Sequence, residues 1–98
     1  MTWANHIRRI GPAGDPAAAC DQFAARLPTI ERARGVDHPS TLAIRYFIAV
    51  WTGRAGNASG ARDQLAALLP IRERILGVGH SDARATRRQL AFWVDEVG

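Results

Sequence analysis

The sequence predicts an all-α fold in which antiparallel helical hairpins are stacked as a solenoid. The first observation is that the 98-residue chain matches itself when it is shifted by 42 residues, which is the mark of a repeat architecture. The second is that hydrophobic residues, 47% of the chain, recur at helical spacing. The third is that the chain is rich in alanine and lacks the alternating β-branched residues of a β-propeller, whose period is similar. A stacked helical solenoid therefore explains the repeat best.

The repeat keeps one constant offset, so no insertion separates its copies. Each copy holds turn glycines, an interior proline and a tryptophan, a combination that chance does not align. The matched residues are Gly14 and Gly56, Asp21-Gln22 and Asp63-Gln64, Ala24-Ala25 and Ala66-Ala67, Leu27-Pro28 and Leu69-Pro70, Glu31-Arg32 and Glu73-Arg74, Gly35-Val36 and Gly77-Val78, His38 and His80, Arg45 and Arg87, Ala49 and Ala91, Trp51 and Trp93, and Gly56 and Gly98.

The first long helix is expected to follow Asp15, whose side chain can cap it, with Pro16 at the first helical position. Gly35 supplies its stop, because the left-handed backbone of a helix C-terminus is easiest for glycine. Its apolar residues share one stripe and are Ala19, Phe23, Leu27 and Ile30.

A shorter helix is expected to start near Pro39 and to end at Gly53 and Gly56. From Leu42 to Trp51 this segment is apolar nearly all round. A helix of that kind is covered by neighbours on more than one side.

The next long helix is predicted from Ala58 to Leu76, with Asn57 as its cap and Gly77 as its stop. A last helix is expected to start near Asp82. Pro28 and Pro70 fall inside the two long helices, where a proline removes one backbone hydrogen bond, so we expect a bend at each.

Composition and charge argue against a membrane-spanning, disulfide-bonded or secreted protein. No run approaches the roughly 18 apolar residues of a membrane-spanning helix. The 13 basic residues, all arginine, exceed the 9 acidic ones, which gives a net charge of +4. The single cysteine, Cys20, has no partner for an intrachain disulfide, so a reducing compartment is expected. The segment Trp3-Ala4-Asn5-His6-Ile7-Arg8-Arg9, which precedes Cys20, contains no continuous apolar stretch, so we expect no signal peptide and a cytoplasmic protein.

The turn between the helices carries a family resemblance. The segment Gly35-Val36-Asp37-His38-Pro39-Ser40-Thr41-Leu42, preceded by Ile30-Glu31-Arg32, resembles the tetratricopeptide repeats of the 42-residue, kinesin-light-chain type. Residues 71–80 repeat the pattern, although Ser81 replaces the usual proline and Arg84 the leucine matched by Leu42. The chain is also similar to bacterial proteins in which such repeats follow a nucleotide-binding signalling domain.

The resemblance implies one right-handed solenoid array over residues 1–98. In the family's order the short helix comes first in each unit, so residues 1–34 form a truncated first unit, 39–76 a complete unit, and 82–98 the lone first helix of a further unit. That lone helix is expected to leave an apolar face uncovered. Either it caps the array, or the chain is a fragment of a longer array, or the chain self-associates through this helix.

The family binds peptides or partner proteins in a concave groove lined by the first helices of successive units. The resemblance therefore implies a non-catalytic protein-interaction module, and we expect an acidic or mixed apolar and acidic ligand, because arginines would bind carboxylates and aromatic residues would supply apolar area. The expected groove residues are Asn5, Arg8, Tyr46, Val50, Arg54, Arg88, Gln89 and Phe92.

The sequence gives little support for catalysis or metal binding. His38 and His80 recur with the repeat, which indicates a structural role at each helix start. A metal site would need further ligands at close spacing, and no phosphate-binding loop is present. The acidic residues recur by repeat, as helix-surface residues do. We expect no enzyme activity, no metal and no cofactor.

Two alternatives remain open. A basic helical protein can bind nucleic acid, and Arg84, Arg87 and Arg88 form a local cluster. Acidic residues are interspersed, however, and no arginine stripe follows one helix, so this alternative is the weaker one. The other alternative is a purely structural or dimerising part of a larger repeat-containing signalling protein.

Overall fold

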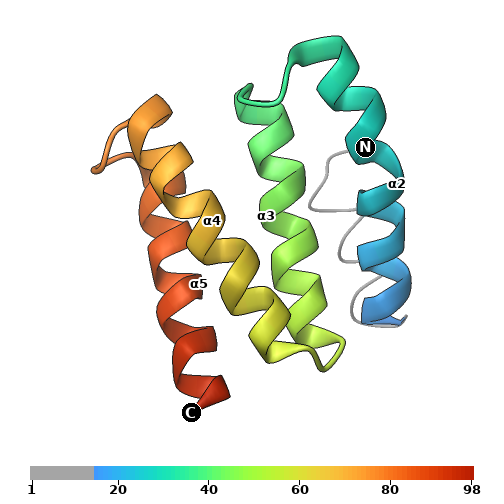
Figure 1. The fold of residues 1–98 in the computed structure, drawn as a ribbon, viewed down its shortest axis with the longest axis vertical. Helices are drawn as coiled ribbons and strands as arrows, with labels where there is room; N and C mark the ends of the chain where they lie inside the picture. Colours follow the sequence, from blue (N-terminus) through green and yellow to red (C-terminus); the bar gives the residue numbers. More distant parts are fainter. Residues whose placement is uncertain (1–14) are drawn as a thin grey trace.

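The computed structural model describes residues 15–98, and Asn5 and Arg8 lie outside the described residues. Four helices follow one another: α2 (Pro16–Arg34), α3 (Pro39–Arg54), α4 (Ala58–Leu76) and α5 (Ser81–Val97). They run antiparallel to their sequence neighbours and lie side by side (Figure 1). The described part of the chain is therefore all-helical, as predicted.

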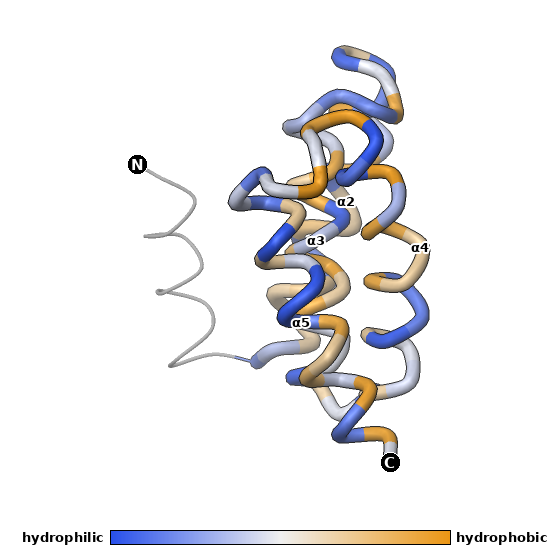
Figure 2. Tube along the Cα trace, turned by 90° about the vertical axis from the view of Figure 1, so that its left-hand side faces the viewer, coloured by the Kyte–Doolittle hydropathy of each residue, from blue (hydrophilic) through white to orange (hydrophobic). Residues whose placement is uncertain are grey.

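Each helix packs mainly against the helix that precedes or follows it in the chain, and α3 also touches α5. Figure 2 shows α4 on one side of α3 and α5. The shorter helices α3 and α5 thus lie next to each other, which matters for the candidate site. None of the helices in residues 15–98 combines the length and apolarity needed to cross a bilayer.

The ends of the long helices match the predicted caps. The Asp15 carboxylate accepts a hydrogen bond from the backbone N–H of Ala17 at 2.9 Å, and the Asn57 side-chain oxygen accepts one from Gly60 at 2.9 Å. Gly35 and Gly77 adopt positive φ values of 94° and 102°. Both long helices continue through their internal prolines, and the expected bends there stay predictions.

The two histidines have the same role at the starts of the short helices. Nδ1 of His38 accepts a hydrogen bond from the backbone N–H of Ser40 at 3.0 Å. Nδ1 of His80 accepts one from Asp82 at the same distance. Because each histidine satisfies a free N–H at a helix N-terminus, its recurrence follows from the fold. The helix capped by His80 begins at Ser81, one residue before the predicted start.

Equivalent residues of the 42-residue repeat form equivalent clusters in the hydrophobic core. One buried cluster contains Ala19, Phe23 and Trp51, with Ile44. The other contains their repeat equivalents, which are Ala61, Leu65 and Trp93, with Ala49. Each tryptophan is 7% exposed, so both pack between helices.

α3 is covered on two sides, as its apolar sequence predicts. Trp51 belongs to the cluster shared with α2, and Ala49 to the cluster shared with α4 and α5. At about 3.6 residues per turn, two edges of α3 lie between the sides that face these clusters. One edge carries Tyr46, which packs against the second cluster, with Val50 and Arg54, and the opposite edge carries Ile48, which packs against the first cluster, with Arg45 and Thr52.

Gly53 does not end α3, contrary to the prediction. It lies inside the last turn, and the helix ends at Arg54. A Cβ atom at Gly53 would lie 2.5 Å from Cζ2 of Trp93. Gly53 is therefore required for the close approach of the Trp93 ring, and the turn itself is made by Gly56, whose φ is 107°.

Candidate functional site

The edge of α3 that carries Tyr46, Val50 and Arg54, together with the adjacent side of α5, brings together most of the expected groove residues. Arg54, Gln89 and Phe92 line one open pocket of about 310 Å³, and Trp93 forms part of its wall. Val50 is only 9% exposed, so it contributes packing beneath this face and little contact area. We call this surface the α3–α5 face, defined by Tyr46, Arg54, Arg88, Gln89 and Phe92.

The pocket combines an apolar wall with a positive charge. The ring of Phe92, 51% exposed, meets the Trp93 ring edge to face at a centroid distance of 4.7 Å. Nε1 of Trp93 donates a hydrogen bond to the side-chain oxygen of Gln89 at 3.2 Å, which fixes both groups. The guanidinium carbon of Arg54 lies 5.3 Å from the centroid of the Trp51 ring, a cation–π distance.

Tyr46 lies at the other end of this face in a positive environment. Burial raises the pKa of Tyr46 above its ordinary value of 10.0, while the positive charges of Arg72, Arg88 and Arg54 oppose the rise and the charge of Asp82 adds to it. The phenol therefore stays neutral at physiological pH and can donate a hydrogen bond to an anionic partner group.

Arg72 is a component of this environment that the sequence reasoning missed. It is 4% exposed, and its guanidinium carbon lies 5.1 Å from the centroid of the Tyr46 ring. Nη1 donates hydrogen bonds to the hydroxyl of Thr86 at 3.1 Å and to the backbone carbonyl of Asp82 at 3.4 Å, but Nε has no partner. The pKa of Arg72 is lowered chiefly by burial, against the opposing effects of Asp82 and Tyr46.

The charge of Arg72 is not neutralised by an ion pair. Within residues 15–98 Arg72 pairs with no carboxylate, whereas Arg62 pairs with Asp63, Arg74 with Asp37 and Arg87 with Glu73. A buried cation without a carboxylate partner contributes a positive potential beneath Tyr46, because little water screens it there.

A signal for Arg72 was present in the repeat. The 42-residue offset places Arg72 at the position of Ile30 and Thr86 at the position of Ile44. In the first hairpin Ile30 packs against the cluster that contains Ile44. A charged residue at a position that is apolar in the other copy therefore marks one place where the packing of the two hairpins differs.

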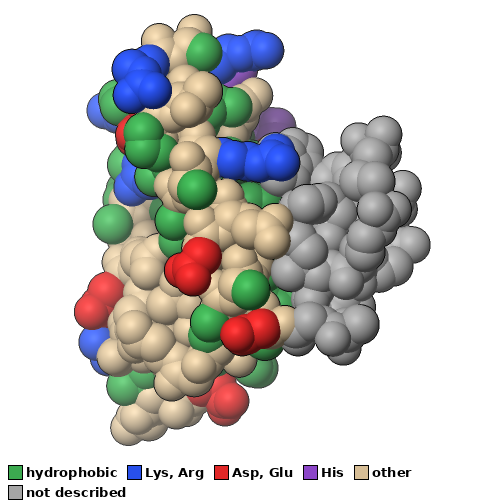
Figure 3. All heavy atoms as spheres, turned by 90° about the vertical axis from the view of Figure 1, so that its right-hand side faces the viewer, with side chains coloured by type: hydrophobic (Ala, Val, Ile, Leu, Met, Phe, Trp, Pro, Cys, Tyr) green, Lys and Arg blue, Asp and Glu red, His purple; other side chains and the backbone are tan. Residues whose placement is uncertain are grey.

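The basic cluster at the start of α5 is smaller than its sequence indicates. Nη2 of Arg87 donates to a carboxylate oxygen of Glu73 at 2.7 Å and to the carbonyl of Val78 at 3.1 Å. This leaves Arg84 and Arg88 exposed. On the α2 side, basic side chains gather at one end and acidic ones at the other (Figure 3). These placements do not form a continuous basic stripe on that side, as nucleic-acid binding would favour.

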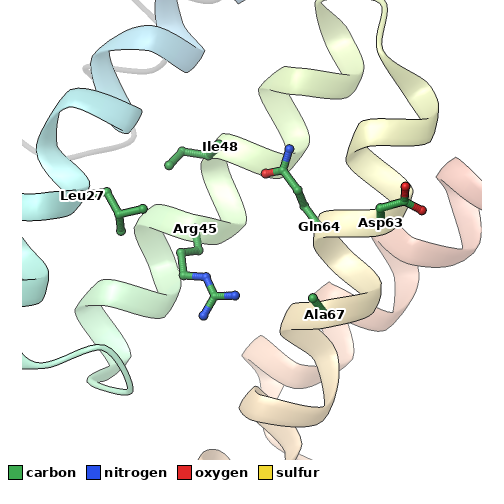
Figure 4. A pocket seen from close by; sticks show the side chains of 6 residues that line it. All are labelled: Leu27, Arg45, Ile48, Asp63, Gln64 and Ala67. Atoms are coloured by element: carbon green, nitrogen blue, oxygen red, sulfur yellow. The ribbon is translucent and has the colours of Figure 1, made fainter.

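A second pocket of about 340 Å³ opens on the opposite side of α3, between α2 and α4 (Figure 4). Its polar groups include one cation, Arg45, and one anion, Asp63, so their formal charges cancel. The residues that line it are Leu27, Arg45, Ile48, Asp63, Gln64 and Ala67. No aromatic side chain lines this pocket, in contrast to the one on the α3–α5 face.

Two other kinds of reactive or ligating group are the thiol of Cys20 and the side chains that could bind a metal ion. Sγ of Cys20 lies 3.3 Å from the hydroxyl oxygen of Thr52 and is partly buried. Within residues 15–98, no group of three histidine, cysteine, aspartate or glutamate side chains is placed to hold a metal ion.

Comparisons with models of protein families, with curated proteins and with solved structures found no match to this chain.

Proposed function

We propose that this chain is a protein-interaction module of the tetratricopeptide type, and that it binds a peptide or a partner protein on the α3–α5 face. The observation that carries the proposal is the pocket formed by Arg54, Gln89, Phe92 and Trp93. An exposed aromatic ring beside a fixed polar group and a cation is the kind of surface that partners use as an anchor. The repeat period and the turn motif support the finer assignment to a right-handed solenoid of the kinesin-light-chain type.

The proposed ligand combines an apolar side chain with carboxylates. The apolar side chain would lie against Phe92 and Trp93, and the carboxylates would be held by Arg54 and Arg88. The positive potential around Tyr46 also favours a negatively charged partner. We further propose that the protein is bacterial, acts in the cytoplasm, and performs no catalysis.

A pair of synthetic peptides tests this function. The first has two leucines flanked on both sides by glutamates, and the second replaces every glutamate with glutamine. Isothermal titration should show that the glutamate peptide binds more tightly. The double variant Arg54→Glu with Arg88→Glu should weaken its binding at least tenfold, which is about 1.4 kcal/mol.

Two controls keep the experiment specific. Arg32→Glu with Arg34→Glu changes the net charge by the same amount on exposed positions of α2, so it should leave binding nearly unchanged. Phe92→Ala should weaken binding without unfolding the protein, because the ring is half exposed. Equal binding of both peptides, or equal losses in both double variants, would refute the proposed site.

A further inference from the structure

The side of α3 that receives the second hairpin follows one stripe. Leu42, Tyr46, Ala49 and Gly53 are spaced by four, three and four residues, so they share one side of the helix. Ala49 packs in a cluster with Ala61 and Leu65 of α4 and Trp93 of α5. Leu42 and Ala49 are fully buried. We call these four residues the docking stripe. It accepts the next hairpin because its side chains are largely apolar and because Gly53, at its end, has no side chain.

The same stripe on α5 has a different chemistry. The 42-residue offset places Arg84, Arg88, Ala91 and Asp95 at the four positions of the docking stripe. All four are exposed. Three of them therefore differ in ways that oppose docking, since burying a charge without a partner is costly.

Of these three differences, the presence of Asp95 at the position equivalent to Gly53 hinders docking most. The ring of Trp93 lies so close to Gly53 that even a Cβ atom would be 2.5 Å from it. In a third hairpin of this repeat, the equivalent tryptophan would lie over position 95. There it would meet a Cβ atom and a carboxylate, so the hairpin could not approach as α4 and α5 approach α3.

From these differences we infer that α5 closes the stack: its outer stripe rejects a further hairpin of this repeat. An uncovered apolar face on this helix stays a prediction, with Phe92, Val94 and Val97 exposed, but the stripe that would receive a hairpin carries Arg84, Arg88 and Asp95. The inference concerns the surface of α5 and holds whatever lies beyond Gly98. It shares Arg88 with the proposed peptide-binding face, but its test measures the docking of a hairpin and not the binding of a peptide.

An in-phase extension tests the inference directly. A second copy of residues 57–98 is appended after Gly98, where it would continue the repeat without a change of offset. On the unaltered α5, the appended hairpin should not dock. The Tm should stay within about 2 °C of the parent protein, and limited trypsin digestion should remove the extension and leave a product of the 98-residue size.

The matched variant restores the docking stripe. It carries Arg84→Leu, Arg88→Tyr and Asp95→Gly, which copy the residues of α3. With these changes the extension should resist trypsin, and the Tm should rise by at least about 5 °C, since docking of one hairpin adds an interface to the array.

Either of two results would overturn the inference. One is an extension that is protected and raises the Tm on the unaltered α5. The other is an extension that stays unprotected on the restored stripe, in a protein whose circular dichroism shows intact helices. If the triple variant does not fold, Asp95→Gly alone should give partial protection of the extension, and no protection would count against the inference.

Discussion

Arg72 donates a hydrogen bond to the hydroxyl of Thr86 at 3.1 Å, at the positions where the other hairpin carries Ile30 and Ile44. The contact joins α4 to α5 in the same place where apolar packing joins α2 to α3. The two hairpins therefore share their tryptophan clusters but differ at this contact. The polar version leaves Nε of Arg72 without a partner, which is a cost that the apolar version does not have.

Replacing the polar contact with the apolar one should stabilise the protein. The double variant Arg72→Ile with Thr86→Ile removes a buried, unpaired charge and restores the residues of the first hairpin. We expect its free energy of unfolding to rise by about 1–3 kcal/mol in a urea titration. Thr86→Ile alone should lower it by about 1–3 kcal/mol, because the guanidinium then loses an acceptor. A double variant that is less stable than the parent protein would contradict this explanation.

Gly53→Ala should be destabilising although the substitution is helix-favouring in general. The added Cβ would collide with the Trp93 ring, so we expect a loss of about 1–3 kcal/mol. Gly79→Ala is the control, because a Cβ atom there meets no other atom within 4 Å. It should change stability by less than about 0.5 kcal/mol. Urea unfolding of the two variants compares them directly, and equal effects would argue against the close contact.

The titration of Tyr46 should report the charges of the α3–α5 face. It is the only tyrosine in the sequence, so the absorbance of tyrosinate in the folded protein follows this group alone. The midpoint should lie above 10.0, because burial raises the pKa of Tyr46. Arg88→Glu should move it further upward, since Arg88 lowers this pKa. Arg32→Glu is the control and should leave it in place.

The sign of the linked stability change follows from the raised pKa. A neutral phenol that is favoured in the folded state contributes stability below pH 10, and this contribution is lost as the pH rises through the folded-state pKa. The free energy of unfolding should therefore fall above pH 10. Tyr46→Phe should lose that part of the pH dependence. A midpoint at or below 10.0 would show that the surrounding arginines outweigh burial.

The elements were predictable from sequence because their signals are local. Asp15 and Asn57 lie next to the helix starts that they cap, and Gly35 and Gly77 lie at the stops that they form. The family resemblance implies that Arg54, Gln89 and Phe92 lie near one groove, and these three residues line one pocket. That the pocket binds a partner stays a prediction.

What the sequence did not reveal depends on contacts between distant residues. Gly53 was interpreted as a helix stop, because nothing nearby in the sequence indicates that the ring of Trp93 lies against it. Arg72 was missed because an arginine in an amphipathic helix is normally exposed. Its burial becomes visible only when the packing of α4 against α5 and Tyr46 is known.

The pairing of each helix with its sequence neighbour has a consequence for how the chain folds. Most tertiary contacts join segments that are close in the sequence, so little loop-closure entropy opposes their formation. Helical proteins with such local contacts fold in microseconds to milliseconds. We therefore expect fast folding, with either hairpin able to nucleate and the other to propagate from it.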